Sequence, residues 1–327
     1  MRVLLIKMSS LGDVVHALAP VTDAARAKSG IIFDWVAEEA YREIPKWHPA
    51  VNRVIVAPLR RWRKSPIKTI RSGEWSAFRA ELRREKYALV LDAQGLLKSA
   101  FVGRQAPAPL VGRSMRTARE PAAALFYKRR IPIDLRKTEV EQIRELFAKA
   151  LDYAQPNTPA DFGVDRTQFA NPISGRYALL LHGAAWESKL WPEDRWIAVG
   201  KSIKSAGLNV LLPWGSERER ECAERIARAI GGAVLPKIPI AELARTIANA
   251  EFVVGLDTGL THIAVAFGVP TLTIYGPSVP VYESVARGEL INLCSTDSKI
   301  VDTSRPTTVA ADAVITAIQP WLTRASM

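Results

Sequence analysis

The sequence is poor in cysteine and has no long apolar run. Cys222 and Cys294 are its two cysteines in 327 residues, which excludes a disulfide framework and indicates a reducing, cytoplasmic compartment. The amino terminus carries four consecutive apolar residues, at positions 3–6, and this is too few for a signal peptide. No apolar run approaches the roughly 20 residues of a membrane span. We therefore expect a protein without a membrane-spanning segment, either soluble or peripheral at a membrane.

Signatures of several ligand sites are also absent. The chain has neither a G-x-x-x-x-G-K-[ST] loop nor a G-x-G-x-x-G turn after its first strand, which disfavours a P-loop enzyme and an NAD-dependent dehydrogenase. No Gly-x-Ser-x-Gly elbow supports a serine hydrolase. The histidines His16, His48, His182 and His262 form no ligand cluster, and no Asp-x-Asp triplet is present. We therefore expect no metal site.

The charge of the chain is unbalanced. Its 45 Lys and Arg face 33 Asp and Glu, which gives a formal net charge of +12. In two windows of the first half, residues 44–73 and 93–119, every charged side chain is basic. An anionic partner is expected, and composition leaves nucleic acid, a phosphorylated sugar and an acidic membrane open. Trp47, Trp62 and Trp75 lie in or beside these windows and could stack on bases or lie at a lipid headgroup boundary.

Strand-length apolar runs alternate with helical patterns along both halves of the chain. The predicted strands cover 2–7, 33–37, 51–58, 88–92, 109–112, 177–182, 209–212, 233–235, 252–256 and 270–275. The predicted helices cover 14–28, 75–86, 138–152, 192–205, 216–230, 240–250 and 308–322. This alternation predicts an α/β protein with two doubly wound, parallel-sheet domains. We place the first domain at 1–160, the second at 161–307 and a terminal helix at 308–327.

The stretch 251–277 is the most informative unit, because it reads as strand, turn, helix and strand. It places Asp257, Thr258 and Gly259 where a strand ends and a helix begins. A helix amino terminus presents unpaired N–H groups and partial positive charge, which suit a phosphate or a sugar hydroxyl. Asp257 could equally serve only as the helix cap.

Three other positions follow predicted strands and face the same choice between structure and function. Asp13 lies in the loop 8–13, where a helix cap is favoured over a general base by the pattern alone. Lys189 lies in the loop 182–192, where it is either a solvated lysine or a ligand for phosphate. Glu219 either reaches ribose hydroxyls or stabilises the first turn of its helix.

Long stretches, dispersed over nearly the whole chain, resemble the lipopolysaccharide heptosyltransferases. They are MRVLLIKMSSLGDVVHAL, FDWVAEEAYREIPKWH, RRWRKSPIK, DAQGLLKSA, TAREP, LPWG and FVVGLDTGLTH, with D-T-G-x-x-H and Y-G-P in the 251–277 unit. The resemblance implies the GT-B architecture: two Rossmann-like domains facing a central cleft, with the C-terminal helix crossing back to the first domain. It also implies an inverting, metal-independent transfer of L-glycero-D-manno-heptose from ADP-heptose to Kdo of Kdo-lipid A, without a cofactor. The alternative is a later heptosyltransferase that acts on an already heptosylated core.

The resemblance also implies a role for individual residues. Asp13 matches the catalytic base, which reverses the preference for a helix cap. The donor-binding residues would be Lys189, Glu219, Asp257, Thr258, Gly259 and His262. The acceptor-binding residues would be Ser10, Arg60, Arg61, Lys64, Lys98 and Arg119. Relatives often carry hydroxyl residues where this chain has Ala184 and Ala185, so backbone N–H groups would have to serve the phosphates there.

The implied partners are ADP-heptose, Kdo-lipid A and the anionic cytoplasmic leaflet of the inner membrane. The enzyme is therefore expected in the cytoplasm and peripherally on that membrane face, and it is not expected to bind nucleic acid.

Overall fold

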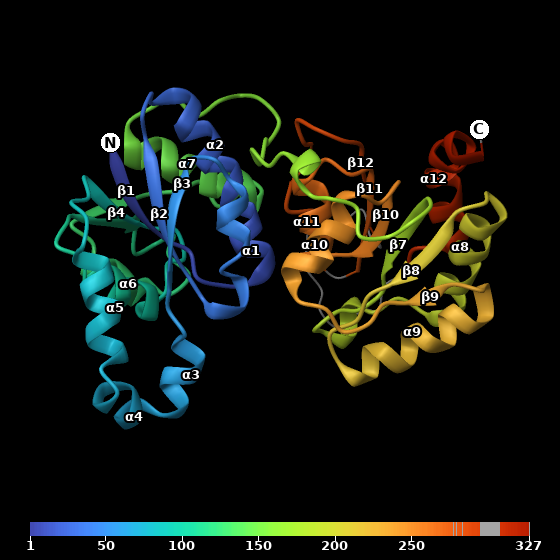
Figure 1. Cartoon of the computed structure of the whole chain (residues 1–327). Helices are drawn as coiled ribbons and strands as arrows, with labels where there is room; N and C mark the ends of the chain where they lie inside the picture. Colours follow the sequence, from blue (N-terminus) through green and yellow to red (C-terminus); the bar gives the residue numbers. More distant parts are fainter. Residues whose placement is uncertain (277, 279, 283, 295–307, 327) are drawn as a thin grey trace. The chain divides into compact units, whose positions relative to one another are not determined.

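The chain folds into two compact units, which are described separately. The computed structural model describes residues 1–276, 278, 280–282, 284–294 and 308–326. The first unit comprises Met1–Val164 and the second Asp165–Met327 (Figure 1). The boundary lies slightly beyond the predicted 160/161 division, because Ala160, Phe162 and Val164 are still buried.

The first unit is a six-stranded parallel sheet with helices around it, in the order β3-β2-β1-β4-β5-β6. Its strands are β1 (Arg2–Ile6), β2 (Ile32–Ala37), β3 (Val51–Val56), β4 (Leu89–Asp92), β5 (Leu110–Arg113) and β6 (Arg129–Ile131). Its helices are α1 (Leu11–His16), α2 (Leu18–Ala27), α3 (Leu59–Lys64), α4 (Pro66–Arg71), α5 (Glu74–Arg83), α6 (Leu97–Gly103) and α7 (Glu139–Leu151). Four of the five residues of β1 are buried, as expected of a parallel strand covered on both faces.

The structure corrects the sequence prediction at two places in this unit. The first helix begins at Leu11 rather than at residue 14, so Asp13 lies in the first helical turn and not in the preceding loop. The helices α3, α4 and α6 and the strand β6 were not predicted. Each of these elements is short, and an amphipathic period needs a longer window to become visible.

The second unit is also a six-stranded parallel sheet, in the order β12-β11-β10-β7-β8-β9. Its strands are β7 (Tyr177–Leu181), β8 (Asn209–Leu212), β9 (Ala233–Val234), β10 (Val253–Leu256), β11 (Thr271–Tyr275) and β12 (Leu290–Cys294). Its helices are α8 (Glu193–Ser205), α9 (Glu217–Ile230), α10 (Ile240–Ala248), α11 (Gly259–Ala266) and α12 (Ala311–Ser326). Strand β12 was not predicted, and Pro277 and residues 295–307 of the predicted domain lie outside the described residues.

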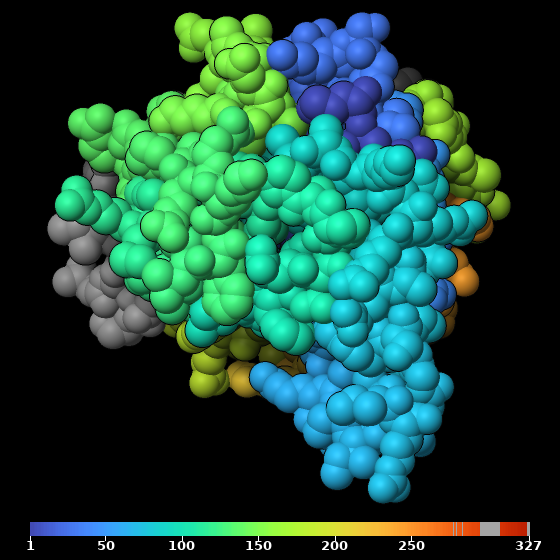
Figure 2. Space-filling model, turned by 90° about the vertical axis from the view of Figure 1, so that its left-hand side faces the viewer, coloured from blue at the N-terminus to red at the C-terminus, as the bar shows by residue number. Residues whose placement is uncertain are grey.

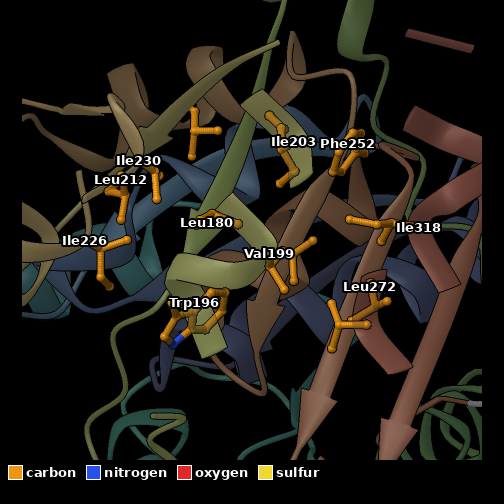
Figure 3. Packing of buried hydrophobic residues seen from close by; sticks show 14 of the residues in the cluster. Leu180, Trp196, Val199, Ile203, Leu212, Ile226, Ile230, Phe252, Leu272 and Ile318 are labelled. Carbon is orange, nitrogen blue, oxygen red and sulfur yellow. The ribbon is translucent and has the colours of Figure 1, made fainter. Parts of the chain in front are cut away.

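The terminal helix α12 contributes to the core of the second unit. Val314, Ile318 and Trp321 are buried together with residues of the second sheet and of α8, and Figure 3 shows Ile318 near Phe252 and Leu272. The indole Nε1 of Trp321 donates to Glu289 Oε2 over 2.6 Å. The described part of this helix therefore packs on the second unit, and its predicted packing on the first domain stays a prediction. The apolar face of α12 packs against the second sheet, next to α8.

In each sheet, the strand order reverses next to the first strand of the unit. In the first unit, β2 and β3 follow one another on one side of β1, and β4 then lies on the other side of β1. In the second unit, the reversal lies between β7 and β10. Open parallel sheets bind ligands beyond the carboxyl ends of their strands at such a switch point. A ligand site is therefore expected at the loops after β1 and β4 in the first unit and after β7 and β10 in the second.

Two features of the described residues concern the environment of the chain: the apolar length of the helices and the exposure of the cysteines. No helix among the described residues is both long enough and apolar enough to cross a bilayer. Cys222 is half-buried and Cys294 is exposed.

Candidate active site

Asp13 is part of the turn that starts α1 at the first switch point. Ser10 is the N-cap residue. Asp13 Oδ2 accepts hydrogen bonds from the Ser10 backbone N–H at 3.0 Å and from Ser10 Oγ at 2.8 Å. The aspartate thus closes a capping box from the third helical position. Ser10, not Asp13, is the cap, and one carboxylate oxygen of Asp13 is committed to the turn.

The other carboxylate oxygen of Asp13 lies between two cations. Lys7 Nζ donates to Asp13 Oδ1 over 3.0 Å, and Arg119 donates to the same oxygen over 2.9 Å. Lys7 is 1% exposed, and it also donates to the carbonyl of Ala93 over 3.2 Å. Burial would raise the pKa of Asp13, but the charges of Lys7 and Arg119 outweigh it and hold this pKa well below its usual range. The site therefore presents an ionised carboxylate at neutral pH.

Lys7 was not singled out in the sequence, although a signal is present there. It is the first charged residue after four buried apolar positions of β1, and a parallel strand ends where its apolar run ends. Burial lowers the pKa of Lys7, while Asp13 acts in the opposite direction. A lysine at the end of a buried strand, six positions before an aspartate, is thus a pattern typical of an internal ion pair.

Gln94 holds the loop that precedes α1. Its Oε1 accepts from the backbone N–H of Met8 at 2.8 Å and of Ser9 at 3.2 Å, and its amide nitrogen donates to the Ser9 carbonyl. The neighbouring Asp92 is completely buried and accepts from Ser99 Oγ and Tyr127 Oη, both at 2.8 Å. Asp92 is therefore enclosed by structural bonds, whereas Gln94 positions the backbone next to Ser10.

Four of the six predicted acceptor residues form two pairs, one at Asp13 and one at a groove, and Arg61 and Lys64 belong to neither pair. Ser10 and Arg119 contact Asp13, and Arg119 also donates to Glu139 at 3.1 Å. Arg60 and Lys98 line a groove beside α3 and α4. The structure does not bring Arg61 to Asp13, because its guanidinium pairs with Glu74 at 2.7 Å. Lys64 is exposed at the end of α3.

Lys189 and Asp257 meet at the second switch point. Lys189 follows β7 and Asp257 follows the adjacent β10. Lys189 Nζ donates to Asp257 Oδ2 over 2.5 Å and to the Asp257 carbonyl over 3.2 Å. Asp257 is buried, whereas Lys189 stays partly exposed. The pair places the partly exposed side chain of Lys189 at the carboxyl edge of the sheet.

Asp257 is also held by the rest of the D-T-G-x-x-H motif and by the loop after β11. His262 Nε2 lies 3.4 Å from Asp257 Oδ1, and Ser278 Oγ donates to Asp257 Oδ2 over 2.7 Å. Burial would raise the pKa of Asp257, but His262 and Lys189 hold it below its usual range. The imidazole Nδ1 of His262 is 2.8 Å from Tyr282 Oη. Ser278 and Tyr282 were missed in the sequence, since only folding brings the loop after β11 to this corner.

Thr258 and Gly259, not Asp257, form the start of α11. Thr258 is the N-cap residue, and its side chain makes no capping bond. The alternative of Asp257 as the helix cap is therefore wrong. Because the first N–H groups of a helix lack partners inside it, the amino terminus of α11 can donate to an anion next to Lys189.

Glu219 lies beyond β8, next to the loop after β7. Its Oε2 accepts from the backbone N–H of Gly215 at 2.6 Å and of Ser216 at 3.2 Å, which makes it part of the capping box of α9. A Cβ added at Gly183 would lie 2.7 Å from Glu219 Cδ, so a larger residue at position 183 would displace the carboxyl group of Glu219. One oxygen of Glu219 is committed to the helix start, and the other faces Gly183. Glu219 therefore stabilises the first turn of α9. The alternative, a contact with ribose hydroxyls, stays a prediction.

A metal site was not expected, and the described residues contain no group of three or more His, Cys, Asp or Glu side chains that could hold a metal ion.

Comparison with known proteins identifies the family. The sequence profile described as Glycosyltransferase family 9 (heptosyltransferase) matches residues 75–309. The chain is 49% identical to lipopolysaccharide heptosyltransferase 1 of Pseudomonas aeruginosa over 86% of this chain and 80% of that protein. It is 44% identical to lipopolysaccharide heptosyltransferase 1 of Escherichia coli K12 over 86% of this chain and 89% of that protein.

A solved structure extends this similarity to the fold. The E. coli heptosyltransferase WaaC with ADP-2-deoxy-2-fluoro heptose superposes with a TM-score of 0.85 at 40% identity. The match covers 98% of this chain and 99% of that one. The predicted GT-B class is confirmed by this match and by the two parallel six-stranded sheets. The chain is therefore a glycosyltransferase and belongs to the heptosyltransferases of glycosyltransferase family 9.

Proposed function

We propose that this protein transfers L-glycero-D-manno-heptose from ADP-heptose to a Kdo residue of Kdo-lipid A, as the first heptose of the lipopolysaccharide inner core. The observation that carries the proposal is the similarity, over nearly the full chain, to a heptosyltransferase solved with an ADP-heptose analogue. The names of the most similar relatives point to the same step. The Lys189–Asp257 pair at the carboxyl edge of the second sheet supports the proposal, since Lys189 would bind the diphosphate of the donor.

In the proposed mechanism, Asp13 acts as the general base. Its carboxylate removes the proton from the attacking Kdo hydroxyl while that oxygen forms a bond to the anomeric carbon. The bond from the anomeric carbon to the ADP oxygen breaks with its electron pair, so a single displacement inverts the configuration. Arg119 would hold the Kdo carboxylate next to Asp13, and its contact with Asp13 supports this role.

A low pKa makes Asp13 a weak base, and acceptor binding would correct this. A carboxylate of the acceptor near Arg119 would offset the positive charge that lowers the pKa of Asp13. The pKa of Asp13 would then rise toward the range in which a base works best. The acceptor would thereby activate the residue that deprotonates it.

The departing ADP gains negative charge in the transition state. Lys189 and the amino terminus of α11, at Thr258 and Gly259, would stabilise this charge. Asp257 and His262 would keep Lys189 in place, and Glu219 would contact the ribose. In this scheme the protein supplies by its own groups the positive charge that some glycosyltransferases take from a divalent metal.

The proposed acceptor is tested by comparing Kdo-lipid A with and without a first heptose. Transfer to the unmodified acceptor, measured as ADP release and as a mass increase of one heptose, would support the proposal. Transfer to the heptosylated acceptor alone would instead identify a later heptosyltransferase. Lipopolysaccharide heptosyltransferase 2 of Salmonella typhimurium matches only 28% of this chain, at 27% identity, which favours the first step.

We also propose that the enzyme works at the cytoplasmic leaflet of the inner membrane. The exposed basic side chains of α3 and α4 include Arg61, Arg63, Lys64, Lys68 and Arg71. Each basic residue near an anionic surface contributes about 1 kcal/mol to binding. Binding to vesicles with anionic lipids should therefore weaken as salt is raised, and salt-resistant binding would refute this electrostatic mode.

A further inference from the structure

A groove of about 710 Å³ opens in the first unit between α3, α4, α5 and α6. The α3–α4 segment that forms one side of it projects from this unit, as the light-blue part of Figure 2 shows. Apolar side chains from all four helices line the groove: Leu59, Trp62, Ile70, Trp75 and Phe101. Its volume is in the range of pockets that enclose small ligands or parts of larger ones.

Aromatic contacts make one wall of the groove rigid. Trp75 stacks on Phe101 with 5.6 Å between ring centroids and an interplanar angle of 13°. Trp62 meets Trp75 edge to face at 5.6 Å, and its Nε1 donates to Glu74 over 2.9 Å. Despite this packing, Phe101 remains half exposed and Ile70 is 69% exposed. The wall is thus preformed and keeps apolar surface in contact with water.

The rim of the groove is basic. Arg60, Arg63 and Lys98 belong to its lining and are exposed. The one acidic residue of the lining, Glu38, is buried, and burial raises its pKa although Arg60 and Lys98 oppose the shift. A ligand that complements this surface has an apolar body and an anionic head.

The groove lies at the same sheet edge as Asp13. Its lining comes from the segments that follow β2, β3 and β4, and Asp13 follows β1, which lies between β2 and β4. A molecule whose apolar part lay in the groove would therefore carry its head group along the edge on which Asp13 lies.

We propose that the groove binds one fatty acyl chain of the anionic lipid acceptor. This inference rests on the proposed function and adds to it that the enzyme recognises the lipid part of its acceptor as well as the sugar. The basic rim holds the anionic groups near the head, and the aromatic wall removes methylene groups from water. Each methylene group that is removed from water should strengthen acceptor binding about fourfold.

The test compares two variants on two acceptors. Ile70→Asp places a charge in the groove lining, whereas Ile67→Asp places the same charge on the same helix outside the lining. Ile67 and Ile70 are 66% and 69% exposed, so neither change disturbs a core. The acceptors are Kdo-lipid A analogues with and without one short acyl chain, both kept below the concentration at which they form micelles.

We expect the wild-type enzyme and Ile67→Asp to prefer the acylated acceptor, and Ile70→Asp to raise the KM for it about tenfold. All three enzymes should use the deacylated acceptor equally well. Equal loss in the two variants would overturn the proposal, because the α4 surface would then contact lipid generally. A wild-type enzyme indifferent to the acyl chain, or an unaffected Ile70→Asp variant, would also overturn it. If neither acceptor is heptosylated by the wild type, the proposed function itself fails.

Discussion

Replacing Asp13 by Asn removes the proposed base and also leaves Lys7 without its counter-charge. Lys7 is buried, and it donates to Asp13 and to the backbone carbonyl of Ala93. Loss of one member of a buried ion pair destabilises a protein by about 3–5 kcal/mol. For a unit of this size, such a loss lowers Tm by roughly 6–20 °C. Asp13→Asn should therefore be both less stable and inactive, and the single variant cannot separate the two effects.

The double variant Lys7→Met, Asp13→Asn separates them. Met fills a volume similar to that of Lys without a charge, and Arg119 keeps Glu139 as its partner at 3.1 Å. A buried ion pair replaced as a whole by neutral side chains is often tolerated. We expect Tm to return to within a few degrees of the wild-type value, while kcat stays about 10²–10⁴-fold lower. Differential scanning fluorimetry and the rate of ADP release measure the two quantities.

A matched control lies in the same unit. Asp23 and Arg144 form another buried ion pair, with 2.7 Å between Asp23 Oδ2 and Arg144 Nε. Asp23→Asn should lower Tm by an amount similar to Asp13→Asn, yet folded enzyme should keep the wild-type kcat. Recovery of kcat together with Tm in the double variant would refute the assignment of Asp13 as the base. Asp13 would then affect activity only by stabilising the folded enzyme.

Three further measurements test the proposed site. Because Lys7 and Arg119 hold the pKa of Asp13 low, the carboxylate stays ionised as pH falls, so kcat/KM should decline only well below the usual aspartate range. The acid limb of kcat should lie at higher pH than the acid limb of kcat/KM, because an anionic acceptor raises the pKa of Asp13 in the complex. If the two acid limbs coincide, the acceptor does not activate Asp13. Lys189→Met should weaken ADP binding about 10–100-fold in calorimetry, as expected for a lost charge-assisted hydrogen bond, whereas Lys201→Met, an exposed position on α8, should leave it unchanged. Incubation with EDTA should leave transfer unaffected, and a loss restored by Mg²⁺ would show that a metal takes part.

The sequence pattern predicted ten of the strands and the doubly wound class of both domains, because these depend on local chain properties. Continuous apolar runs such as that of β1 indicate buried parallel strands, and the order of strands and helices indicates doubly wound domains. The predicted corner of Lys189, Asp257 and His262 is present in the structure, since all three follow or begin elements at one sheet edge. Their roles with substrate remain predictions.

Contacts between segments distant in the sequence could not be predicted in this way. The pairing of Lys7 with Asp13 was also missed although it is local, because it depends on the turn into α1, which begins earlier than the apolar period suggested. The groove combines side chains from short helices whose local sequence reads only as a basic stretch. The position of α12 depends on the fit between its apolar face and the second sheet, a property of two surfaces that neither segment reveals alone.

The two lysine–aspartate pairs have a consequence for discrimination among small anions. Lys7 is buried and Lys189 is partly exposed, and each ammonium group already has a carboxylate beside it. An isolated inorganic phosphate would have to compete with that carboxylate and could offer few contacts in return. A nucleotide or a glycolipid makes additional contacts with the surrounding groups, so it can share the lysine without displacing the aspartate. Both sites should consequently remain available in a cell rich in phosphate, with their positive charge reserved for ligands large enough to reach the neighbouring residues.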